Sequence, residues 1–319
     1  MVSDNLSEAS ESSESASWMQ KLALSPGDKV AFLAPARKIT AEEIRSAEVM
    51  FQDSGLIVEM GCSIGAEEDQ FAGPDELRAS DLQRCLDDPE IRAIVCARGG
   101  YGTARLLPRL NPATLRSAPK WIAGFSDVTA LHGWVNRNSN IPSLHSTMPV
   151  LINKDSGQAW KSMIETMMGQ SPKAVWTKAH SLNRNGKARG KLIGGNLSVL
   201  YSLRGTPYFP NLKGAILFLE DLDEYLYHID RMMLNFKLGG LFGEIAGLVI
   251  GGMSDMNDNT IPFGKNAEEI IRAQVNGFEF PVCFGYPAGH IADNRALVLG
   301  MDAELEVSSE GATIQQALG

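Results

Sequence analysis

The sequence predicts an α/β protein with an N-terminal α/β domain on a parallel sheet and a mixed, β-rich C-terminal domain. Short apolar runs alternate with amphipathic segments in the first half of the chain, whereas apolar runs dominate the second half. The 319 residues also exceed the usual length of one domain. An alternation of strand, helix and strand favours a parallel sheet with right-handed crossovers, which is the basis of the N-terminal prediction.

The first half contains the clearest individual elements. Thr40 followed by Glu43 is a capping-box pattern that predicts the start of a helix, and Gly55 marks its end. Four short apolar runs around this helix and after it are typical of buried strands. These runs are residues 29–34, 56–60, 91–97 and 120–125.

The ends of the two domains are predicted from composition. Residues 1–20 hold seven Ser and four acidic residues without Lys or Arg, which is typical of a disordered tail. A polar stretch near 171–190 lacks periodicity and is the best candidate for a boundary. We therefore expect a tail at 1–24, an N-terminal domain at 25–170, a linker at 171–188 and a C-terminal domain at 189–319.

Composition excludes several classes of protein. With 29 Lys and Arg against 38 Asp and Glu, the formal charge of −9 lacks the basic surface that nucleic-acid binding needs. The four Cys show no CxxC spacing, so neither a zinc ribbon nor a dense disulfide framework is expected, and a reducing cytoplasm fits best. No apolar run reaches the roughly 18 residues of a membrane span, so no membrane partner is expected.

Ser126 follows the apolar run WIAGF and precedes a segment with helical spacing, so it lies on a strand-to-helix turn. Such a turn exposes the hydroxyl, and the following amides and the helix dipole favour an oxyanion there, as acyl transfer requires. Alternatively the serine is a simple N-cap, because Ser is preferred at that position. The motif is not the GxSxG of hydrolases, since Val128 occupies the position of the second Gly.

The segment ARGGYG at 97–102 follows a buried strand and carries three glycines. A loop at the carboxyl end of a parallel strand is where open α/β sheets bind ligands. Its spacing is neither a P-loop nor GxGxxG, so a nucleotide site is not indicated. The alternative is a glycine-rich turn in which Arg98 is solvated or pairs with a carboxylate.

Glu220 is the first charged residue after the apolar run AILFL, so it lies at a strand terminus. Asp221, Asp223 and Glu224 follow closely, and any of the four could serve in a site. A cluster of charges after a strand is also typical of a solvated loop. The residues alone leave this choice open.

Elimination among the five His residues points to His290 as the candidate general base. His290 follows the run PVCFGY on a loop with polar neighbours. The other four lie in predicted helices, in the polar linker or near a strand end; they are His132, His145, His180 and His228. A surface His without a function is the alternative. No HExxH or other dense ligand spacing is present, so neither a metal nor another cofactor is expected.

Seven motifs in order resemble the LD-carboxypeptidase family over residues 27–300. They are GDKVAFLAPA, ARGGYGTARLLPRL, WIAGFSDVTALH, GKLIGGNLSVL, ILFLEDLDEYLYHIDRM, GLVIGG and FGYPAGHIADNRALVLG. The resemblance implies a Ser-His-Glu triad of Ser126, His290 and Glu220 at the interface of two domains. It also implies a metal-independent cytoplasmic homodimer that releases a terminal D-amino acid, usually D-alanine, from murein tetrapeptides.

With this assignment, the oxyanion donors are expected to be the amide of Asp127 and an amide of the glycine loop, with Gly100 favoured over Gly99. Arg98, beside these glycines, is expected either to grip the free carboxylate of the substrate or to brace the loop by pairing with an acid such as Asp127.

Two other functions are weighed. A related branch of the family comprises microcin-immunity peptidases, which cleave a peptidyl nucleotide antibiotic. The continuation DEYLYHIDRM after FLED looks closer to the murein-recycling branch. A non-catalytic protein that binds a small ligand between its domains is the alternative from another class, and the joint presence of the three triad residues disfavours it.

Overall fold

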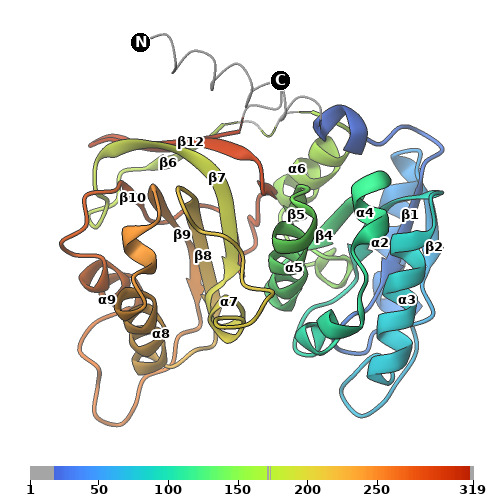
Figure 1. The fold of residues 1–319 in the computed structure, drawn as a ribbon, viewed down its shortest axis with the longest axis horizontal. Coiled ribbons are helices and arrows are strands. Elements are labelled where there is room, and N and C mark those ends of the chain that lie inside the picture. Colours follow the sequence, from blue (N-terminus) through green and yellow to red (C-terminus); the bar gives the residue numbers. More distant parts are fainter. Residues whose placement is uncertain (1–17, 171, 173, 317–319) are drawn as a thin grey trace.

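The computed structural model describes residues 18–170, 172 and 174–316. Two sheets lie side by side, each with helices packed on it (Figure 1). This confirms the predicted fold class, because the first sheet is mainly parallel and the second is mixed.

The first sheet contains all four strands that were predicted in the first half of the chain. Its strands are β1 (Lys29–Leu33), β2 (Ile57–Met60), β3 (Ile91–Cys96), β4 (Trp121–Gly124), β5 (Ser143–His145) and β11 (Leu297–Leu299). Their spatial order is β11-β5-β4-β3-β1-β2. Strands β1 to β5 are parallel, so their carboxyl ends meet at one edge of the sheet, and β11 pairs with β5 in the antiparallel direction.

Helices cover both faces of the first sheet because alternate strand residues point to opposite sides. Phe32 packs among residues of α2 (Ala41–Asp53) and α6 (Gly157–Met167). Leu33 faces the other side with α3 (Asp75–Asp87), α4 (Ala113–Ser117) and α5 (Thr129–Ser139). Burying one large apolar side chain in these layers stabilises the fold by roughly 1.5–3 kcal/mol.

Helix α2 begins as its sequence predicts. The Thr40 hydroxyl accepts a hydrogen bond from the Glu43 amide at 3.3 Å, and the Glu43 carboxylate accepts one from the Thr40 amide at 2.8 Å. This capping box satisfies two amides that lack partners within the helix. Gly55, at φ +85°, follows the last turn and directs the chain into β2.

The second sheet has the spatial order β10-β9-β8-β7-β12-β13-β6. Its strands are β6 (Val175–Lys178), β7 (Gly186–Asn196), β8 (Ile216–Leu222), β9 (Gly247–Ser254), β10 (Val282–Cys283), β12 (Asp302–Val307) and β13 (Gly311–Gln315). Strands β7 to β10 are parallel, and β12, β13 and β6 add antiparallel pairs.

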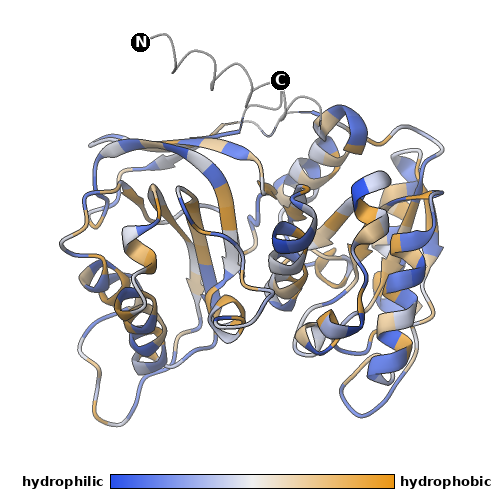
Figure 2. Ribbon diagram, viewed as in Figure 1, coloured by the Kyte–Doolittle hydropathy of each residue, from blue (hydrophilic) through white to orange (hydrophobic). Residues whose placement is uncertain are grey.

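One face of the second sheet packs on helices, which are α7 (Leu197–Ser202), α8 (Leu226–Leu238) and α9 (Ala267–Gln274). The strands in the middle of both sheets are mainly hydrophobic, and the helices carry hydrophilic residues as well (Figure 2). Five short 3-10 helices lie in the described part of the chain: Thr103–Arg105, Leu107–Arg109, Ser126–Val128, Pro149–Leu151 and Leu241–Gly243.

The expected tail at 1–24 includes residues that lie in the core of the first sheet. Residues 1–17 lie outside the described part of the chain, but Met19, Leu22 and Leu24 are buried in the core of the first sheet. The Leu24 amide also donates a hydrogen bond to the Met167 carbonyl at 2.8 Å. The polar composition of the preceding residues concealed this short apolar anchor.

Two further segments differ from the expected organisation. The stretch expected to be a linker contains β6, which pairs with β13 at the edge of the second sheet. Strand β11 comes from the predicted C-terminal domain but extends the first sheet through β5. The chain therefore crosses between the sheets more than once, while the domain boundaries themselves stay predictions. Among the described residues, no helix combines the length and apolarity needed to cross a membrane.

Candidate active site

Ser126 lies at the carboxyl edge of the first sheet, between β4 and α5. Its φ of +62° is in the left-handed region, which costs a non-glycine residue free energy and presents its side chain on a tight turn. Gly124 makes the turn possible: it has φ +149°, and a Cβ there would lie 3.0 Å from Val128 and 3.2 Å from Cys96. The sequence therefore needs glycine two residues before this serine.

Three side chains from distant parts of the chain form one hydrogen-bonded line. Nε2 of His290 lies 3.1 Å from Oγ of Ser126. Nδ1 of the same ring lies 2.7 Å from Oε2 of Glu220. Since a carboxylate accepts hydrogen bonds, Nδ1 carries the proton and Nε2 is left to accept the proton of the serine hydroxyl.

Glycines bring the His290 loop onto β8. Gly289 has φ +106°, and a Cβ there would lie 2.6 Å from Cβ of Glu220. The register between β8 and β9 shifts beside Glu220, where Gly251 would carry a Cβ only 2.4 Å from the Ala288 carbonyl. The motifs GLVIGG and GYPAGH thus place a loop directly against β8, where the strand carries the buried carboxylate of Glu220.

The electrostatic setting makes His290 a stronger base. Burial by itself lowers the pKa of an imidazole, but the charge and hydrogen bond of Glu220 outweigh this and raise the pKa of His290 above its usual value. The Glu220 side chain is fully buried, and its second oxygen, Oε1, has no hydrogen-bond partner among the described residues. The carboxylate is therefore held through Oε2, which lies within hydrogen-bond distance of the ring and the backbone amide of His290.

The glycine loop after β3 lies beside Ser126. A Cβ on Gly99 would lie 3.3 Å from Oγ of Ser126, so this glycine allows the loop to approach the hydroxyl closely. Gly100, at φ +118°, faces the side chain of Arg37 instead, where a Cβ would lie 3.0 Å from Nε. Neither glycine amide donates a hydrogen bond to another described residue, so both are available to a ligand.

The Asp127 carboxylate supports this loop from within the protein. Oδ2 of Asp127 accepts a hydrogen bond from the Thr103 amide at 2.8 Å, and burial raises the pKa of the Asp127 carboxyl. Arg98 does not pair with it: Nη1 of Arg98 instead lies 3.4 Å from the carbonyl oxygen of Lys38, and the side chain stays half-buried. The Asp127 carboxylate therefore holds the loop through the Thr103 amide and not through Arg98, and both roles considered for Arg98 stay predictions.

Sequence reasoning missed Arg37. It follows β1 as Arg98 follows β3, so the rule that ligands bind at the carboxyl ends of parallel strands applies to both. Its side chain is exposed beside Gly100, and no ion pair of Arg37 is found in the described part of the chain. The signal was present in APAR at 34–37, but a single Arg after a strand carries little weight by itself.

Two of the other histidines are buried behind the site. Nε2 of His132 lies 2.9 Å from the carbonyl oxygen of Gly124, and Nδ1 lies 2.9 Å from Oγ of Ser143. Burial lowers the pKa of His132 to about 4, so the neutral ring donates from Nε2 and holds the end of β4. His145 packs edge-on against the Phe125 and Phe218 rings. Both are core residues: a face or core role was expected for His132, whereas His145 was expected only to lie near a strand end.

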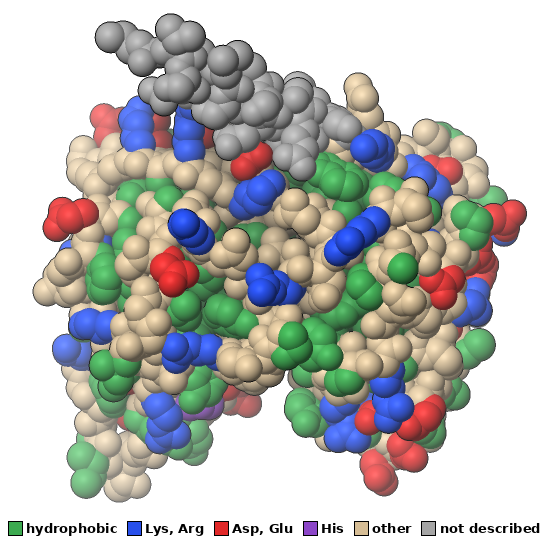
Figure 3. All heavy atoms as spheres, viewed as in Figure 1, with side chains coloured by type: hydrophobic (Ala, Val, Ile, Leu, Met, Phe, Trp, Pro, Cys, Tyr) green, Lys and Arg blue, Asp and Glu red, His purple; other side chains and the backbone are tan. Residues whose placement is uncertain are grey.

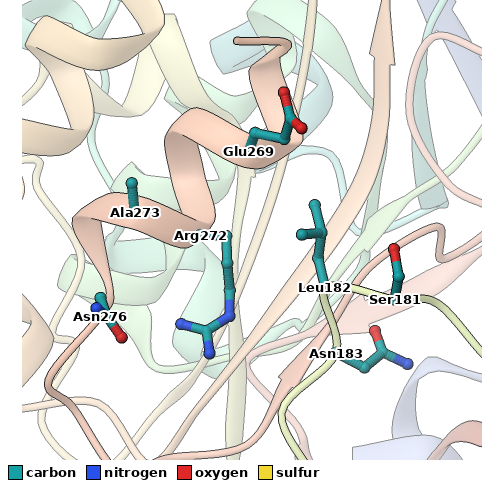
Figure 4. A pocket seen from close by; sticks show the side chains of 7 residues that line it. All are labelled: Ser181, Leu182, Asn183, Glu269, Arg272, Ala273 and Asn276. Atoms are coloured by element: carbon teal, nitrogen blue, oxygen red, sulfur yellow. The ribbon is translucent and has the colours of Figure 1, made fainter.

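An open cavity of about 400 Å³ lies elsewhere, between α9 and the chain before β7. Figure 4 shows the side chains of α9, Arg272 among them, on one side of this cavity and Ser181, Leu182 and Asn183 on the other. None of the residues discussed above lines this cavity. No group of three or more His, Cys, Asp or Glu side chains in the described segments could hold a metal ion. The geometry around Ser126 is thus the better candidate site.

Comparison with known proteins identifies the family. Residues 30–146 match the LD-carboxypeptidase N-terminal domain, and residues 189–305 match the LD-carboxypeptidase C-terminal domain. Together these matches cover more than half of the chain. The chain belongs to the LD-carboxypeptidase family. It is therefore a peptidase, as the seven motifs implied.

Individual members of the LD-carboxypeptidase family are similar over almost their whole length. The "probable murein peptide carboxypeptidase" of Bacillus subtilis is 30% identical over 92% of this chain and 93% of that protein. The crystal structure of muramoyltetrapeptide carboxypeptidase from Oxalobacter formigenes has a TM-score of 0.82 and 26% identity, covering 90% of this chain and 98% of the other. The microcin C7 self-immunity protein of Escherichia coli is 24% identical over 92% and 94%.

Proposed function

We propose that this LD-carboxypeptidase is a serine carboxypeptidase that releases terminal D-alanine from murein tetrapeptides during peptidoglycan recycling. The observation that carries the proposal is the line of hydrogen bonds from Ser126 through His290 to Glu220, at 3.1 and 2.7 Å. The murein peptides named for the relatives support the substrate class. A cytoplasmic location and a homodimer remain predictions.

The proposed reaction proceeds in two steps. Nε2 of His290 takes the proton of Ser126 as its Oγ attacks the carbonyl carbon of the scissile amide, and the imidazolium then protonates the departing D-alanine nitrogen. Nε2 of His290 then deprotonates a water molecule, which hydrolyses the acyl-enzyme, and the proton returns to Oγ of Ser126 as it leaves. The Glu220 carboxylate keeps the ring oriented and stabilises the imidazolium in both steps.

The oxyanion is proposed to bind at the edge of the glycine loop. Its donors would be the amides of Gly100 and Asp127, of which the second follows the nucleophile directly. The positive φ of Gly100 and the tight contact of Gly99 with Ser126 support a backbone that closes around this point. Removing one such donor typically reduces turnover by about 10²- to 10³-fold.

Recognition of the free carboxylate is proposed to involve Arg98, with Arg37, whose side chain lies against Gly100, as a second guanidinium. A guanidinium can bind a carboxylate through two parallel hydrogen bonds. Arg98 has one long hydrogen bond to the Lys38 carbonyl, which leaves other donors available for a ligand. Such a contact would make the enzyme an exopeptidase.

The test uses defined murein tetrapeptides with a terminal D-alanine. The purified protein is expected to release free D-alanine, and the Ser126→Ala variant is expected to release none above background. D-alanine release by both proteins at the same rate would refute the serine mechanism. Tetrapeptides with diaminopimelate or lysine at the third position, assayed in parallel, identify the preferred acyl residue.

Microcin-type activity is the second candidate, supported by the similarity to the self-immunity protein. The same triad would cleave a peptidyl nucleotide. An aminoacyl sulfamoyl adenosine assayed beside the tetrapeptide separates the two functions, because cleavage of this conjugate alone would favour immunity. A binding protein without catalysis would bind the tetrapeptide with equal affinity in wild type and Ser126→Ala and would not react with a fluorophosphonate.

A further inference from the structure

The end of β7 makes a direct contact with the helix that follows Ser126. The Asn196 amide donates a hydrogen bond to Oγ1 of Thr129 at 2.9 Å. Gly195 has φ +136°, and a Cβ there would lie 2.4 Å from the same Oγ1. Thr129 and Asn196 are both buried, so this contact between the second sheet and α5 excludes water.

The Asn196 side chain continues from this contact to the neighbour of Glu220. Its Nδ2 donates to Oδ1 of Asp221 at 2.8 Å, and Oδ2 of Asp221 accepts the Ser198 amide at 2.9 Å. Oδ1 of Asn196 caps α7 by accepting a hydrogen bond from the Val199 amide at 3.1 Å. A buried asparagine whose donor and acceptor are both used can adopt few alternative positions.

We propose that Thr129, Asn196 and Asp221 are positioning residues that set the distance between the nucleophile and its general base. Thr129 begins α5 three residues after Ser126, and Asp221 adjoins Glu220 on β8. Ser126 belongs to the first sheet, whereas Glu220 belongs to the second, so the triad depends on how the sheets meet. This inference rests on the proposed function.

The contact between Thr129 and Asn196 lies near the triad, where a small movement of one sheet relative to the other would change the distance between Ser126 and His290. The lower edge of the view in Figure 3 shows the two halves of the molecule separated by a notch, so they do not meet over their whole height. Near the triad, Thr129 and Asn196 join them through buried polar atoms. A misplacement of about 1 Å between reacting groups can reduce turnover roughly 100-fold, so loss of this contact should appear in kcat.

Thr129→Val tests the proposal, because valine keeps the shape but removes the acceptor of the Asn196 amide. The matched control is Thr166→Val: Thr166 is also buried, but its hydroxyl donates to the Ser162 carbonyl inside α6 at 2.7 Å. Thr129→Ser is the rescue variant, since it keeps the hydroxyl. We expect kcat to fall about 10- to 100-fold in Thr129→Val, with KM nearly unchanged, and to be largely retained in Thr129→Ser.

Tetrapeptide turnover, melting temperature and the rate at which a fluorophosphonate labels Ser126 are measured on each variant. The proposal predicts that the melting temperature decreases by a similar amount in Thr129→Val and Thr166→Val. Only Thr129→Val is expected to show a lower kcat and a lower labelling rate. Equal kcat in these two variants would overturn the proposal. If Thr129→Val does not fold, Asp221→Asn gives the same test. It replaces one carboxylate oxygen by an NH₂ group, which cannot accept the hydrogen bond from the Asn196 side chain or from the Ser198 amide.

The labelling rate separates this inference from the proposed function. Wild-type protein that labels at Ser126 but cleaves no tetrapeptide would refute the substrate, while the effect of Thr129→Val on labelling would still decide the positioning role. Wild-type protein that neither labels nor cleaves would overturn both.

Discussion

Oε2 of Glu220 accepts two hydrogen bonds from the same residue, one from Nδ1 of His290 at 2.7 Å and one from the His290 backbone amide at 3.2 Å. The carboxylate therefore fixes both the ring and the loop that carries it. Because the Glu220 side chain is fully buried, its negative charge acts on the imidazole with little screening by water. This pairing determines the protonation behaviour of the proposed base.

Replacing Glu220 by Gln should shift the pH dependence of catalysis. The proposed base must be neutral, so kcat/KM falls as the pH drops below the pKa of His290, which Glu220 raises above its usual value in the wild type. Without the carboxylate charge, burial dominates and the pKa falls, so the acidic limb of the profile moves to lower pH. The plateau should fall by about 10²- to 10⁴-fold. An unchanged acidic limb would contradict the assignment of Glu220.

The same pair should make stability depend on pH. The folded-state pKa of His290 is raised, so its contribution is fully present below about pH 6.5 and is lost as the pH rises through the folded-state pKa. The difference in melting temperature between wild type and Glu220→Gln should therefore decrease as the pH is raised through this range. Thermal unfolding of both proteins in matched buffers measures this difference. A difference that grows with pH would contradict the expected direction of the pH dependence.

Ser126→Ala should fold normally and lose nearly all turnover. Alanine tolerates the φ of +62° about as poorly as serine, so the backbone strain is unchanged and the cost in stability should be at most about 2 kcal/mol. Ser202→Ala is the control, because the hydroxyl of this exposed serine donates to the Val199 carbonyl in α7, away from the proposed nucleophile. Tetrapeptide assays and circular dichroism of both variants separate loss of chemistry from loss of fold.

Gly289→Ala should disrupt the joint between the His290 loop and β8. The added Cβ would lie 2.6 Å from Cβ of Glu220, which is too close for two carbon atoms. Alanine is also strained at the φ of +106° that Gly289 adopts. Gly264→Ala is the matched control, since it has φ +82° but no atom within 4 Å of the added Cβ. Each should lose about 1–3 kcal/mol from backbone strain, and only Gly289→Ala should also lose turnover and fluorophosphonate labelling.

Arg98→Lys should impair tetrapeptide cleavage more than cleavage of the same peptide with an amidated terminus, if Arg98 grips the carboxylate. Lysine keeps the charge but cannot form the two parallel hydrogen bonds of a guanidinium. Arg37→Lys, tested in parallel, shows which of the two guanidinium groups binds the carboxylate. Equal loss on both substrates in Arg98→Lys would assign Arg98 to the support of the loop.

Leu22→Ala should destabilise the protein, although its position was expected to lie in a disordered tail. Leu22 is fully buried in the core of the first sheet, and removing such a side chain costs about 2–5 kcal/mol. Gln20→Ala is the control, because Gln20 is exposed in the same turn. Chemical denaturation of both variants measures the difference, and equal stability would mean that this segment does not contribute to the core.

The sequence by itself determined the elements whose signals are local. Short apolar runs predicted β1 to β4, and Thr40 with Glu43 predicted the start of α2, because a strand or a cap is set by residues close together in the chain. The seven motifs also determined the family. For the same reason, single residues at strand ends could be nominated as site residues before any distance was known.

Tertiary structure alone decided what depends on contacts between distant segments. Packing, which no short pattern encodes, decided three features: β11 extends the first sheet, Leu22 is buried, and Arg37 faces the glycine loop. The distance of 3.1 Å between Ser126 and His290 is of the same kind. The two residues lie on loops associated with different sheets, so their separation is fixed by how those sheets meet, and a hydrogen bond tolerates an error of only a few tenths of an ångström.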